Sequence, residues 1–350
     1  MILAEATVRL PSVAVAGVVA AATVILTGVV RRVAIAWAVL DVPNERSLHR
    51  VPTPRAGGLA IAIVVLGVVL WLGWRGDLGP RAVIGLIGGA SLVAAVGWVD
   101  DLRSLPNSVR AIAQVAAGGW FLAWTGGLDT LRIGDQSASL GAVGTVFALI
   151  AIVWSINLYN FMDGIDGIAG GQAVVAAGFA AVLLAGVLPG LSLLSAAIGG
   201  ASLGFLAWNW APARIFMGDV GSGLLGFLFA TLAVLSERGG GPPLVSWVLF
   251  GGVFIFDATV TLVRRIVTGE RWYAAHKSHA YQRAVQSGWS HARVSTGVIV
   301  LSAGLGLSGV AVAWRAELLL PCLGGALTLL TVCYLWIEKR MPMRPQSSSR

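Results

Sequence analysis

Long apolar stretches recur along the whole chain, and they restrict its fold more than any other feature. Eleven stretches approach or exceed the roughly 17 residues that a membrane-spanning helix needs. The chain is 57% hydrophobic and 11% charged, with a mean hydropathy of +0.84, which is too apolar for a water-soluble globule. We therefore predict an all-α, polytopic integral membrane protein with about 10–11 transmembrane helices, within residues 13–30, 57–74, 81–99, 109–124, 143–159, 168–188, 191–208, 221–235, 244–267, 294–314 and 317–337.

The positions of lysine and arginine predict the orientation of these helices. With the N-terminus outside, the cytoplasmic loops carry eighteen of the 24 basic residues, as the enrichment of positive charge on that side requires. The C-terminus is then cytoplasmic, residues 1–340 form a single transmembrane domain, and 341–350 form a short cytoplasmic tail. The net charge of +8 reflects this topology and an attraction to anionic lipid or phosphate. No separate basic domain or zinc spacing indicates a nucleic-acid partner.

A stripe of amide and carboxylate side chains follows the apolar stretch 143–156. Asn157, Asn160, Asp163 and Asp166 each lie three residues after the last, a spacing that keeps side chains near one face of a helix. One interpretation is a solvated helix end with capping carboxylates, but a cap needs only one such residue. Four of them favour a site for a cation and a polar ligand at the membrane surface.

Two further acidic motifs fall on the same predicted face of the membrane. Asp100 and Asp101 are adjacent at the end of an apolar helix, where like charges raise each other's proton affinity and oppose the helix dipole. A purely structural role for this pair is therefore disfavoured, and Arg110 could return the compensating charge or hold a phosphate. Asp219 lies in a glycine-rich turn that opens a helix, which suits a divalent cation bridging to phosphate.

Other polar residues leave two interpretations open. Arg50 and Arg55 could clamp a phosphate, although the orientation rule alone also supplies basic residues to this loop. His276 and His279 have a spacing that can bind zinc, but no third and fourth ligand lies nearby, so donors to a sugar or phosphate fit better. Asp257 lies within a predicted span, as a functional group or in an internal hydrogen bond or ion pair.

Four motifs in this order resemble those of the polyprenyl-phosphate N-acetylhexosamine-1-phosphate transferases: Asp100-Asp101, Asn157-x-x-Asn160-x-x-Asp163-Gly-x-Asp166-Gly, Phe216-Met-Gly-Asp219-x-Gly-Ser222 and His276-x-x-His279. The resemblance extends from the Pro-Arg-x-Gly-Gly loop at 54–58 to the histidine loop. It implies an enzyme that moves a sugar 1-phosphate from a UDP-N-acetylhexosamine to undecaprenyl or decaprenyl phosphate, releasing UMP. It also implies Mg²⁺ or Mn²⁺ as cofactor, a possible homodimer, and an active site on the cytoplasmic face of the bacterial inner membrane.

The resemblance also implies a role for each matching residue. The metal ligands would be Asp219 and Asn160, and the groups acting on the lipid phosphate would be Asp100, Asp101 and Arg110, without a decision between the two carboxylates. The nucleotide-binding residues would be Asp163, Asp166, Phe216, Arg50 and Arg55. The sugar or phosphate contacts would be His276, His279 and Arg283.

Two positions differ from the peptidoglycan member of this family. Ser104 stands where that enzyme has a lysine after the acidic pair, and the histidine loop lacks a run of consecutive histidines. The chain therefore resembles more closely the members that initiate O-antigen, lipopolysaccharide or other surface polysaccharides. The competing hypothesis is a secondary transporter or ion channel that uses the acidic cluster, although such proteins usually bind their substrates near the bilayer midplane.

Overall fold

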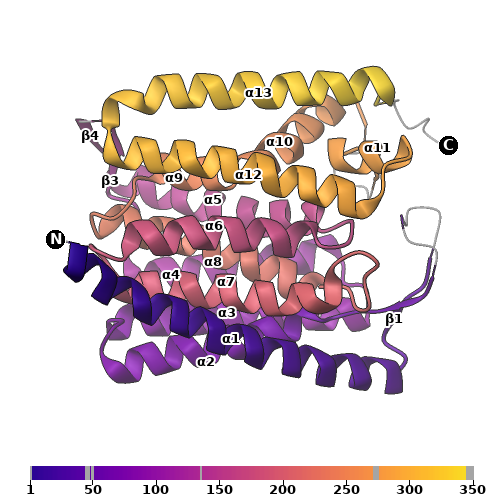
Figure 1. The fold of residues 1–350 in the computed structure, drawn as a ribbon, viewed down its shortest axis with the longest axis horizontal. Helices are drawn as coiled ribbons and strands as arrows, with labels where there is room; N and C mark the ends of the chain where they lie inside the picture. Colours follow the sequence, from indigo (N-terminus) through magenta and orange to yellow (C-terminus); the bar gives the residue numbers. More distant parts are fainter. Residues whose placement is uncertain (1, 44–47, 49–50, 135, 271–275, 344–350) are drawn as a thin grey trace.

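The computed structural model describes residues 2–43, 48, 51–134, 136–270 and 276–343. Its long helices run side by side along one common direction (Figure 1). The α-helices of the described chain, long and short, are α1 (Ile2–Ala36), α2 (Gly58–Arg75), α3 (Pro80–Leu102), α4 (Asn107–Thr125), α5 (Gly141–Met162), α6 (Ile168–Leu184), α7 (Pro189–Asn209), α8 (Asp219–Arg238), α9 (Leu244–Phe250), α10 (Gly252–Val267), α11 (Ala280–Gln286), α12 (His291–Trp314) and α13 (Leu319–Arg340). The described chain is therefore helical, as its apolar stretches predict.

Each predicted apolar stretch coincides with a helix or, for 244–267, with the pair α9 and α10. Among the described residues, eight helices are long and apolar enough to cross a membrane, or nine if the bent pair is one span. The difference from the eleven predicted stretches lies in α4, which carries Arg110 and Gln114, and in α6, which is only 17 residues long. The chain is a polytopic membrane protein in either count.

The break between α9 and α10 bends the ninth span by 79°. Gly251 separates the two helices, and an interruption of this kind frees backbone carbonyls that need a partner inside a membrane. The Gln172 side chain on α6 donates from Nε2 to the Phe250 carbonyl at 2.7 Å. This buried bond satisfies one carbonyl at the bend and fixes α6 against it.

Small residues allow close packing around the two most buried helices, α7 and α8. A Cβ atom on Gly200 would lie 2.3 Å from the Ala16 carbonyl oxygen, and one on Gly204 would lie 2.3 Å from that of Ala20. Helix association in a membrane depends on such backbone approaches because lipid supplies no hydrophobic driving force. The outer helices α1 and α13 expose most of their apolar surface, as expected for helices that face lipid.

Two short hairpins complete the fold. Strands β3 (Thr130–Ile133) and β4 (Gln136–Ser139) pair antiparallel, which confirms the hairpin that the alternating sequence around Gly134 indicates. Strands β1 (Leu40–Asp41) and β2 (Thr53–Pro54) pair within the loop between α1 and α2. The β3–β4 hairpin lies at the same end of the bundle as the start of α1, whereas β1, α11 and the end of α13 lie at the other end (Figure 1). Of the predicted tail 341–350, only residues 341–343 are described.

Candidate active site

A fixed backbone presents Asp219 at the first position of α8. Gly218 before it has a φ of 74°, a conformation that favours glycine, and the helix begins where the glycine-rich motif predicts. The turn is held from the opposite side by Gly57 and Gly58, whose backbone N–H groups donate to the carbonyls of residues 216–217 at 2.8 Å each. The loop before α2 and the loop before α8 are therefore one hydrogen-bonded unit.

Asp101, in the last turn of α3, caps this helix. Its Oδ1 accepts the N–H of Asp219 at 2.9 Å, and its Oδ2 accepts the N–H of Val220 at 3.2 Å. The Arg55 Nε lies 3.1 Å from Oδ1, and the Asp101 side chain is 0% exposed. The first N–H groups of a helix have no carbonyl partner within that helix, and the Asp101 carboxylate accepts two of them in α8. Its negative charge also complements the positive end of the helix dipole. Asp101 thus has a structural role, which the sequence disfavoured for the pair.

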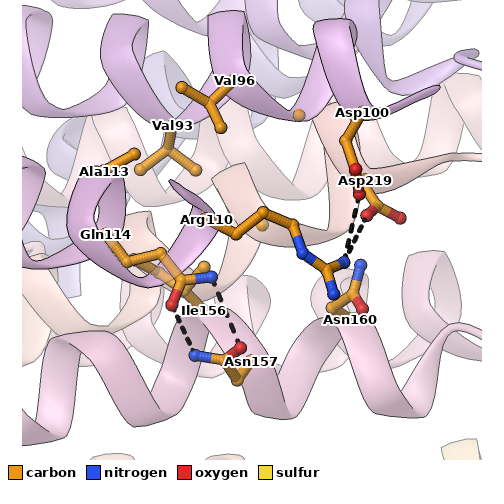
Figure 2. A pocket seen from close by; sticks show the side chains of 12 residues that line it. Val93, Val96, Asp100, Arg110, Ala113, Gln114, Ile156, Asn157, Asn160 and Asp219 are labelled. Atoms are coloured by element: carbon orange, nitrogen blue, oxygen red, sulfur yellow. Dashed lines mark hydrogen bonds and ion pairs between the residues drawn. The ribbon is translucent and has the colours of Figure 1, made fainter. Parts of the chain in front are cut away.

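Asp100, the adjacent carboxylate, faces Arg110 and Asp219 instead (Figure 2). The Arg110 Nη1 lies 3.1 Å from Asp100 Oδ2 and 3.4 Å from Asp219 Oδ2. On the other side of Asp219, the Arg55 Nη2 lies 3.4 Å from Oδ1. Asp219 is therefore held between two guanidinium groups, which offset the charge of the surrounding carboxylates.

The polar stripe after residue 156 is divided between a helix and a loop. Asn157 and Asn160 lie on α5, but the helix ends at Met162, with Asp163 at its C-cap and Asp166 in the loop beyond. The expectation that all four side chains share one helical face is wrong, because the chain leaves the helix before the second pair. The Asn160 Nδ2 donates to the Ser222 hydroxyl at 3.3 Å, and Asn160 lies beside Asp219 in the wall of both cavities.

The loop carboxylate Asp166 is anchored on both oxygens. Its Oδ2 accepts the Ala213 N–H at 3.0 Å, and its Oδ1 lies 3.2 Å from Nδ1 of His291 on α12. The Ser295 hydroxyl, one turn further along α12, donates to the Asp166 carbonyl at 2.7 Å. The loop after α5 is therefore fixed by α12 and by the segment before α8.

Two cavities meet at Asp219 and Asn160, which line both. The large cavity has a volume of about 350 Å³, within the usual range for small-molecule sites. Its other lining residues are mostly polar and include Asp41, Arg55, Asp163, Asp166, Phe216, Gln282 and His291. The small cavity, of about 40 Å³, lies between α3, α4, α5 and α8 and is lined by Asp100, Arg110, Gln114 and Asn157 together with apolar side chains. The large polar cavity and the small, partly apolar cavity thus share the carboxylate of Asp219.

Burial raises the pKa of Asp163 well above its usual value, and the charge of Asp219 adds to this effect. The charges of Asp101 and Asp166 act in the same direction as that of Asp219, and the charge of Arg55 opposes them. A bound cation would favour the ionised form of this carboxyl group. The electrostatics of the cavity therefore suit a positively charged ligand.

Comparisons with known proteins agree with this arrangement. Residues 83–237 match the model of glycosyl transferase family 4. A probable undecaprenyl-phosphate N-acetylglucosaminyl 1-phosphate transferase of Bacillus subtilis is 33% identical over 299 residues, which cover 84% of this chain and 82% of the relative. The decaprenyl-phosphate N-acetylglucosaminephosphotransferase of Mycobacterium tuberculosis is 31% identical over 331 residues, or 82% of this chain and 79% of the relative. The chain belongs to this transferase family.

Membership of the family confirms the enzyme class and leaves the transporter or channel hypothesis unsupported. The protein is a phosphoglycosyltransferase of the polyprenyl-phosphate N-acetylhexosamine-1-phosphate type. In its geometry, Asp100, Asp219 and Asn160 lie together at one end of the bundle. Asp257, the carboxylate within the ninth span, instead accepts the backbone N–H groups of Ala280 and Tyr281 at 2.8 and 3.1 Å, so it caps α11.

The histidine loop of the transferase does not line either cavity, as far as the described residues show. His279 is buried with its Nδ1 3.4 Å from Asp257 Oδ1, and its ring lies 4.9 Å from that of His276. Burial lowers the pKa of His276 to about 3, so this ring is neutral at physiological pH. Arg283 is also buried, and its Nη1 donates to Glu338 Oε2 at 2.6 Å. These three residues support the wall that carries Gln282.

The site differs from the predicted set of residues at several positions. Arg50 lies outside the described residues. The large cavity includes His291, Gln282 and Asp41, which the motifs did not identify. Asp166 and His291 are 125 residues apart, and a lone histidine at the start of a helix gives no signal for such a contact. Gln114 of the small cavity was also not predicted, because it is a single polar residue inside the apolar helix α4.

Asp219 and Asn160 fit a hard divalent cation because they offer a carboxylate and an amide oxygen. No group of three His, Cys, Asp or Glu side chains within the described segments is arranged to hold a metal ion alone. Mg²⁺ is usually bound through one or two carboxylates and the phosphates of a substrate. The donor atoms present in the transferase therefore match that ion better than zinc.

Proposed function

We propose that this transferase moves N-acetylhexosamine 1-phosphate from a UDP-sugar to polyprenyl phosphate and releases UMP. The carrying observation is that Asp219 and Asn160 belong to the walls of both cavities. Two substrates bound on either side would meet at one carboxylate, as a direct transfer between two phosphorylated molecules requires. The names of the relatives, which pair a polyprenyl phosphate with an N-acetylglucosaminyl group, support the choice of acceptor and sugar.

The large cavity suits the UDP-sugar. Its carboxylates Asp163 and Asp166 and its aromatic ring Phe216 offer hydrogen-bond acceptors and a stacking surface to a nucleobase. Arg55 lines the same cavity and can bind a phosphate oxygen. In this assignment, Asp166 is held ready by Ala213 and His291 and needs little rearrangement when the nucleotide binds.

The small cavity suits the phosphate of the lipid acceptor. Arg110 neutralises that phosphate, and Asp100 beside it takes up its proton when the acceptor arrives as a monoanion. An oxygen of the acceptor then attacks the phosphorus attached to the sugar, the bond to the UMP phosphate breaks, and UMP leaves with the electron pair. We assign this role to Asp100 rather than Asp101, because Asp100 lines the small cavity with its Oδ2 beside Arg110, whereas both oxygens of Asp101 accept N–H groups of α8 outside that cavity.

Asp219 and Asn160 would hold Mg²⁺, which would supply charge neutralisation for the diphosphate of the donor. Positioning of the two anionic substrates remains the work of the side chains, since phosphoryl transfer needs little covalent chemistry from the protein. Arg55 and Arg110 lie on opposite sides of Asp219, so each cavity has its own cation for its own phosphate.

The donor supply places this site on the cytoplasmic face of the bacterial inner membrane, in agreement with the distribution of basic residues. UDP-sugars are made in the cytoplasm, and the polyprenyl-diphosphate-sugar would begin a cell-envelope polysaccharide such as an O-antigen.

The test is UMP release by purified protein with undecaprenyl phosphate and a panel of UDP-sugars, in the presence of Mg²⁺, Mn²⁺ or a chelator. We expect turnover with a UDP-N-acetylhexosamine and a loss of turnover when the chelator removes the metal. UMP release from none of the UDP-sugars would contradict the proposed reaction. Full turnover in the chelator would contradict the metal site alone.

A further inference from the structure

Gln114 and Asn157 form a second polar layer in the small cavity, one helical turn away from the charged residues (Figure 2). Gln114 follows Arg110 by four residues on α4, and Asn157 precedes Asn160 by three residues on α5. Side chains at these spacings lie on one face of a helix. The two helices therefore present a charged layer near Asp219 and a neutral amide layer deeper in the bundle.

The amide layer is joined by two unequal hydrogen bonds. The Asn157 Nδ2 donates to Gln114 Oε1 at 2.6 Å and also to the Val153 carbonyl at 2.8 Å, so both of its N–H groups are used. The Gln114 Nε2 donates in return to Asn157 Oδ1 at 3.4 Å, which is beyond the usual length of a good bond. Asn157 thus fixes the Gln114 oxygen, while the Gln114 amide nitrogen remains available to another acceptor.

The wall of the small cavity is charged near Asp219 and mixed neutral polar and apolar one turn deeper. Asp100, Arg110 and Asp219 form the charged part, and the amide pair lies beside the side chains of Val93, Val96 and Ile156. An isoprenoid phosphate has the same sequence of properties, since an anionic phosphate is joined through an ester oxygen to a hydrocarbon chain. The lining therefore matches the hydrocarbon chain of the acceptor as well as its phosphate, which Arg110 neutralises.

We propose that Gln114 is an acceptor-binding residue, whose amide N–H donates to the phosphate group of the polyprenyl phosphate and fixes its depth in the cavity. This inference rests on the proposed function of the small cavity. Asn157 acts through Gln114 and is a positioning residue. When the acceptor enters, the bond of 3.4 Å is replaced by a stronger one to an anionic oxygen, while the bond of 2.6 Å keeps the Gln114 side chain in place.

A purely structural role, as a link between α4 and α5, predicts a different result. Amide pairs between membrane helices contribute only modestly to stability, and their loss would lower the melting temperature without selecting one substrate. An acceptor-binding residue changes the apparent KM for the acceptor and leaves that for the UDP-sugar unchanged. The two roles are therefore separated by kinetics with both substrates varied.

The experiment compares wild type with Gln114→Leu and Gln114→Glu. Gln114→Leu removes the donor at similar size, and we expect the apparent KM for undecaprenyl phosphate to rise about tenfold, as for loss of one hydrogen bond to a charged group. Gln114→Glu places a negative charge beside the phosphate and should raise the apparent KM for undecaprenyl phosphate further. Geranylgeranyl phosphate, which has the same head group and a shorter chain, should show the same increase.

A matched control is Gln172→Leu, which removes a membrane-buried glutamine that donates to the Phe250 carbonyl away from both cavities. It should lower the melting temperature and leave the KM for the acceptor unchanged. If Gln114→Leu fails to fold, Gln114→Asn keeps the amide but shortens its reach and should still weaken acceptor binding. An unchanged KM for the acceptor, an increase confined to the longer lipid, or an equal increase for the UDP-sugar would overturn the inference.

Binding without turnover separates this inference from the proposed function. The stabilisation of the protein by undecaprenyl phosphate alone, measured as a shift in melting temperature, should be smaller in Gln114→Leu than in wild type. If wild type released no UMP but showed this Gln114-dependent stabilisation, the reaction would be wrong and the binding site would stand. Equal stabilisation of both proteins would overturn the binding site even if UMP were released.

Discussion

The two adjacent carboxylates of the site, Asp100 and Asp101, face in different directions and contact different partners. Asp101 is turned into the protein, where it accepts the first N–H groups of α8, and Asp100 is turned towards Arg110 and the small cavity. Consecutive residues near the end of a helix project about 100° apart. This difference lets one short motif hold the backbone of Asp219 and also present a carboxylate to the small cavity.

Asparagine at each position should therefore have a different effect. Asp100→Asn should lower kcat and lower the melting temperature less than Asp101→Asn does, because Asp100 accepts one backbone N–H, from Leu105, and pairs with the half-exposed Arg110. Asp101→Asn should destabilise the fold by about 1–3 kcal/mol, because an amide cannot accept with both of its atoms and one buried N–H loses its partner. Thermal unfolding and UMP release measured on both variants check this assignment. The reverse pattern would mean that the roles are exchanged.

Asp219→Asn should abolish most turnover while the fold is retained. An amide oxygen binds Mg²⁺ more weakly than a carboxylate, and we expect kcat to fall by about 10²–10³, as for the loss of one electrostatic group at a reacting centre. A matched control is Asp129→Asn, which removes an exposed carboxylate that pairs with Arg238. The control should keep wild-type activity. Wild-type turnover by Asp219→Asn across a Mg²⁺ titration would remove Asp219 from the metal site.

His276 should make the stability of the protein depend on pH. Burial, followed by the charge of His279, lowers its pKa to about 3, whereas an unfolded chain binds the proton with a pKa of about 6.5. The stabilisation is therefore fully present above about pH 6.5 and is lost as the pH falls towards 3. The melting temperature should fall less on acidification in His276→Gln than in wild type. Parallel curves for the two proteins would contradict the pKa shift.

Backbone contacts between helices position the start of α8. A Cβ atom on Gly58 would lie 2.2 Å from the Gly221 Cα, and one on Gly97 would lie 2.7 Å from the carbonyl oxygen of Asp219. Helices α2 and α3 thus touch the first turn of α8 without intervening side chains. The location of Asp219 depends on glycines in three elements as well as on its own motif.

Gly58→Ala should push α2 away from α8 and displace Asp219. Overpacking of this kind costs about 1–3 kcal/mol, and we expect a lower melting temperature together with a loss of UMP release. Gly67→Ala lies in the same helix, where a Cβ atom meets nothing within 4 Å, and it should be neutral or slightly stabilising because alanine favours a helix. Equal behaviour of the two variants would show that the contact does not position the site.

The helices could be predicted from apolar length, but their ends and bends could not. The sequence places Asp163 and Asp166 on the same face as Asn160, because a spacing of three is helical, yet α5 ends at Met162. The bend between α9 and α10 depends on Gln172 in another helix. Tertiary contacts of this kind override a local pattern, and they cannot be predicted from the local pattern of a single sequence.

At the scale of the molecule, the sequence predicted that the three acidic motifs meet, but it wrongly added the histidine motif, whose described residues line neither cavity, and did not predict the complete wall of the site. Asp100, Asn160 and Asp219 come from three helices and line one cavity. Their convergence was predictable because charged groups in an apolar chain are restricted to the ends of its helices. His291 and Gln114 were not predicted, since neither has a neighbouring motif. Isolated polar residues gain their meaning only from the fold.

The arrangement of the chain ends predicts the topology of the whole protein. The start of α1 and the β3–β4 hairpin lie at one end of the bundle, and α13 ends at the end that carries α11 (Figure 1). Because the basic loops favour the cytoplasm, we expect the hairpin to face outwards and α11 to face the cytoplasm. In a variant without Cys322 and Cys333, a membrane-impermeant thiol reagent added to intact cells should therefore label Ser139→Cys and spare Ser287→Cys.

Permeabilised cells provide the control for this labelling. Both engineered thiols should react once the reagent can cross the membrane, since Ser139 and Ser287 are exposed. Labelling of Ser287→Cys in intact cells would put the site outside, where UDP-sugars are not made, and would contradict the proposed donor as well as the orientation. Labelling of Ser139→Cys alone would support both the predicted orientation and a cytoplasmic site, because the basic loops and the carboxylates of the site would then lie on the same side of the membrane.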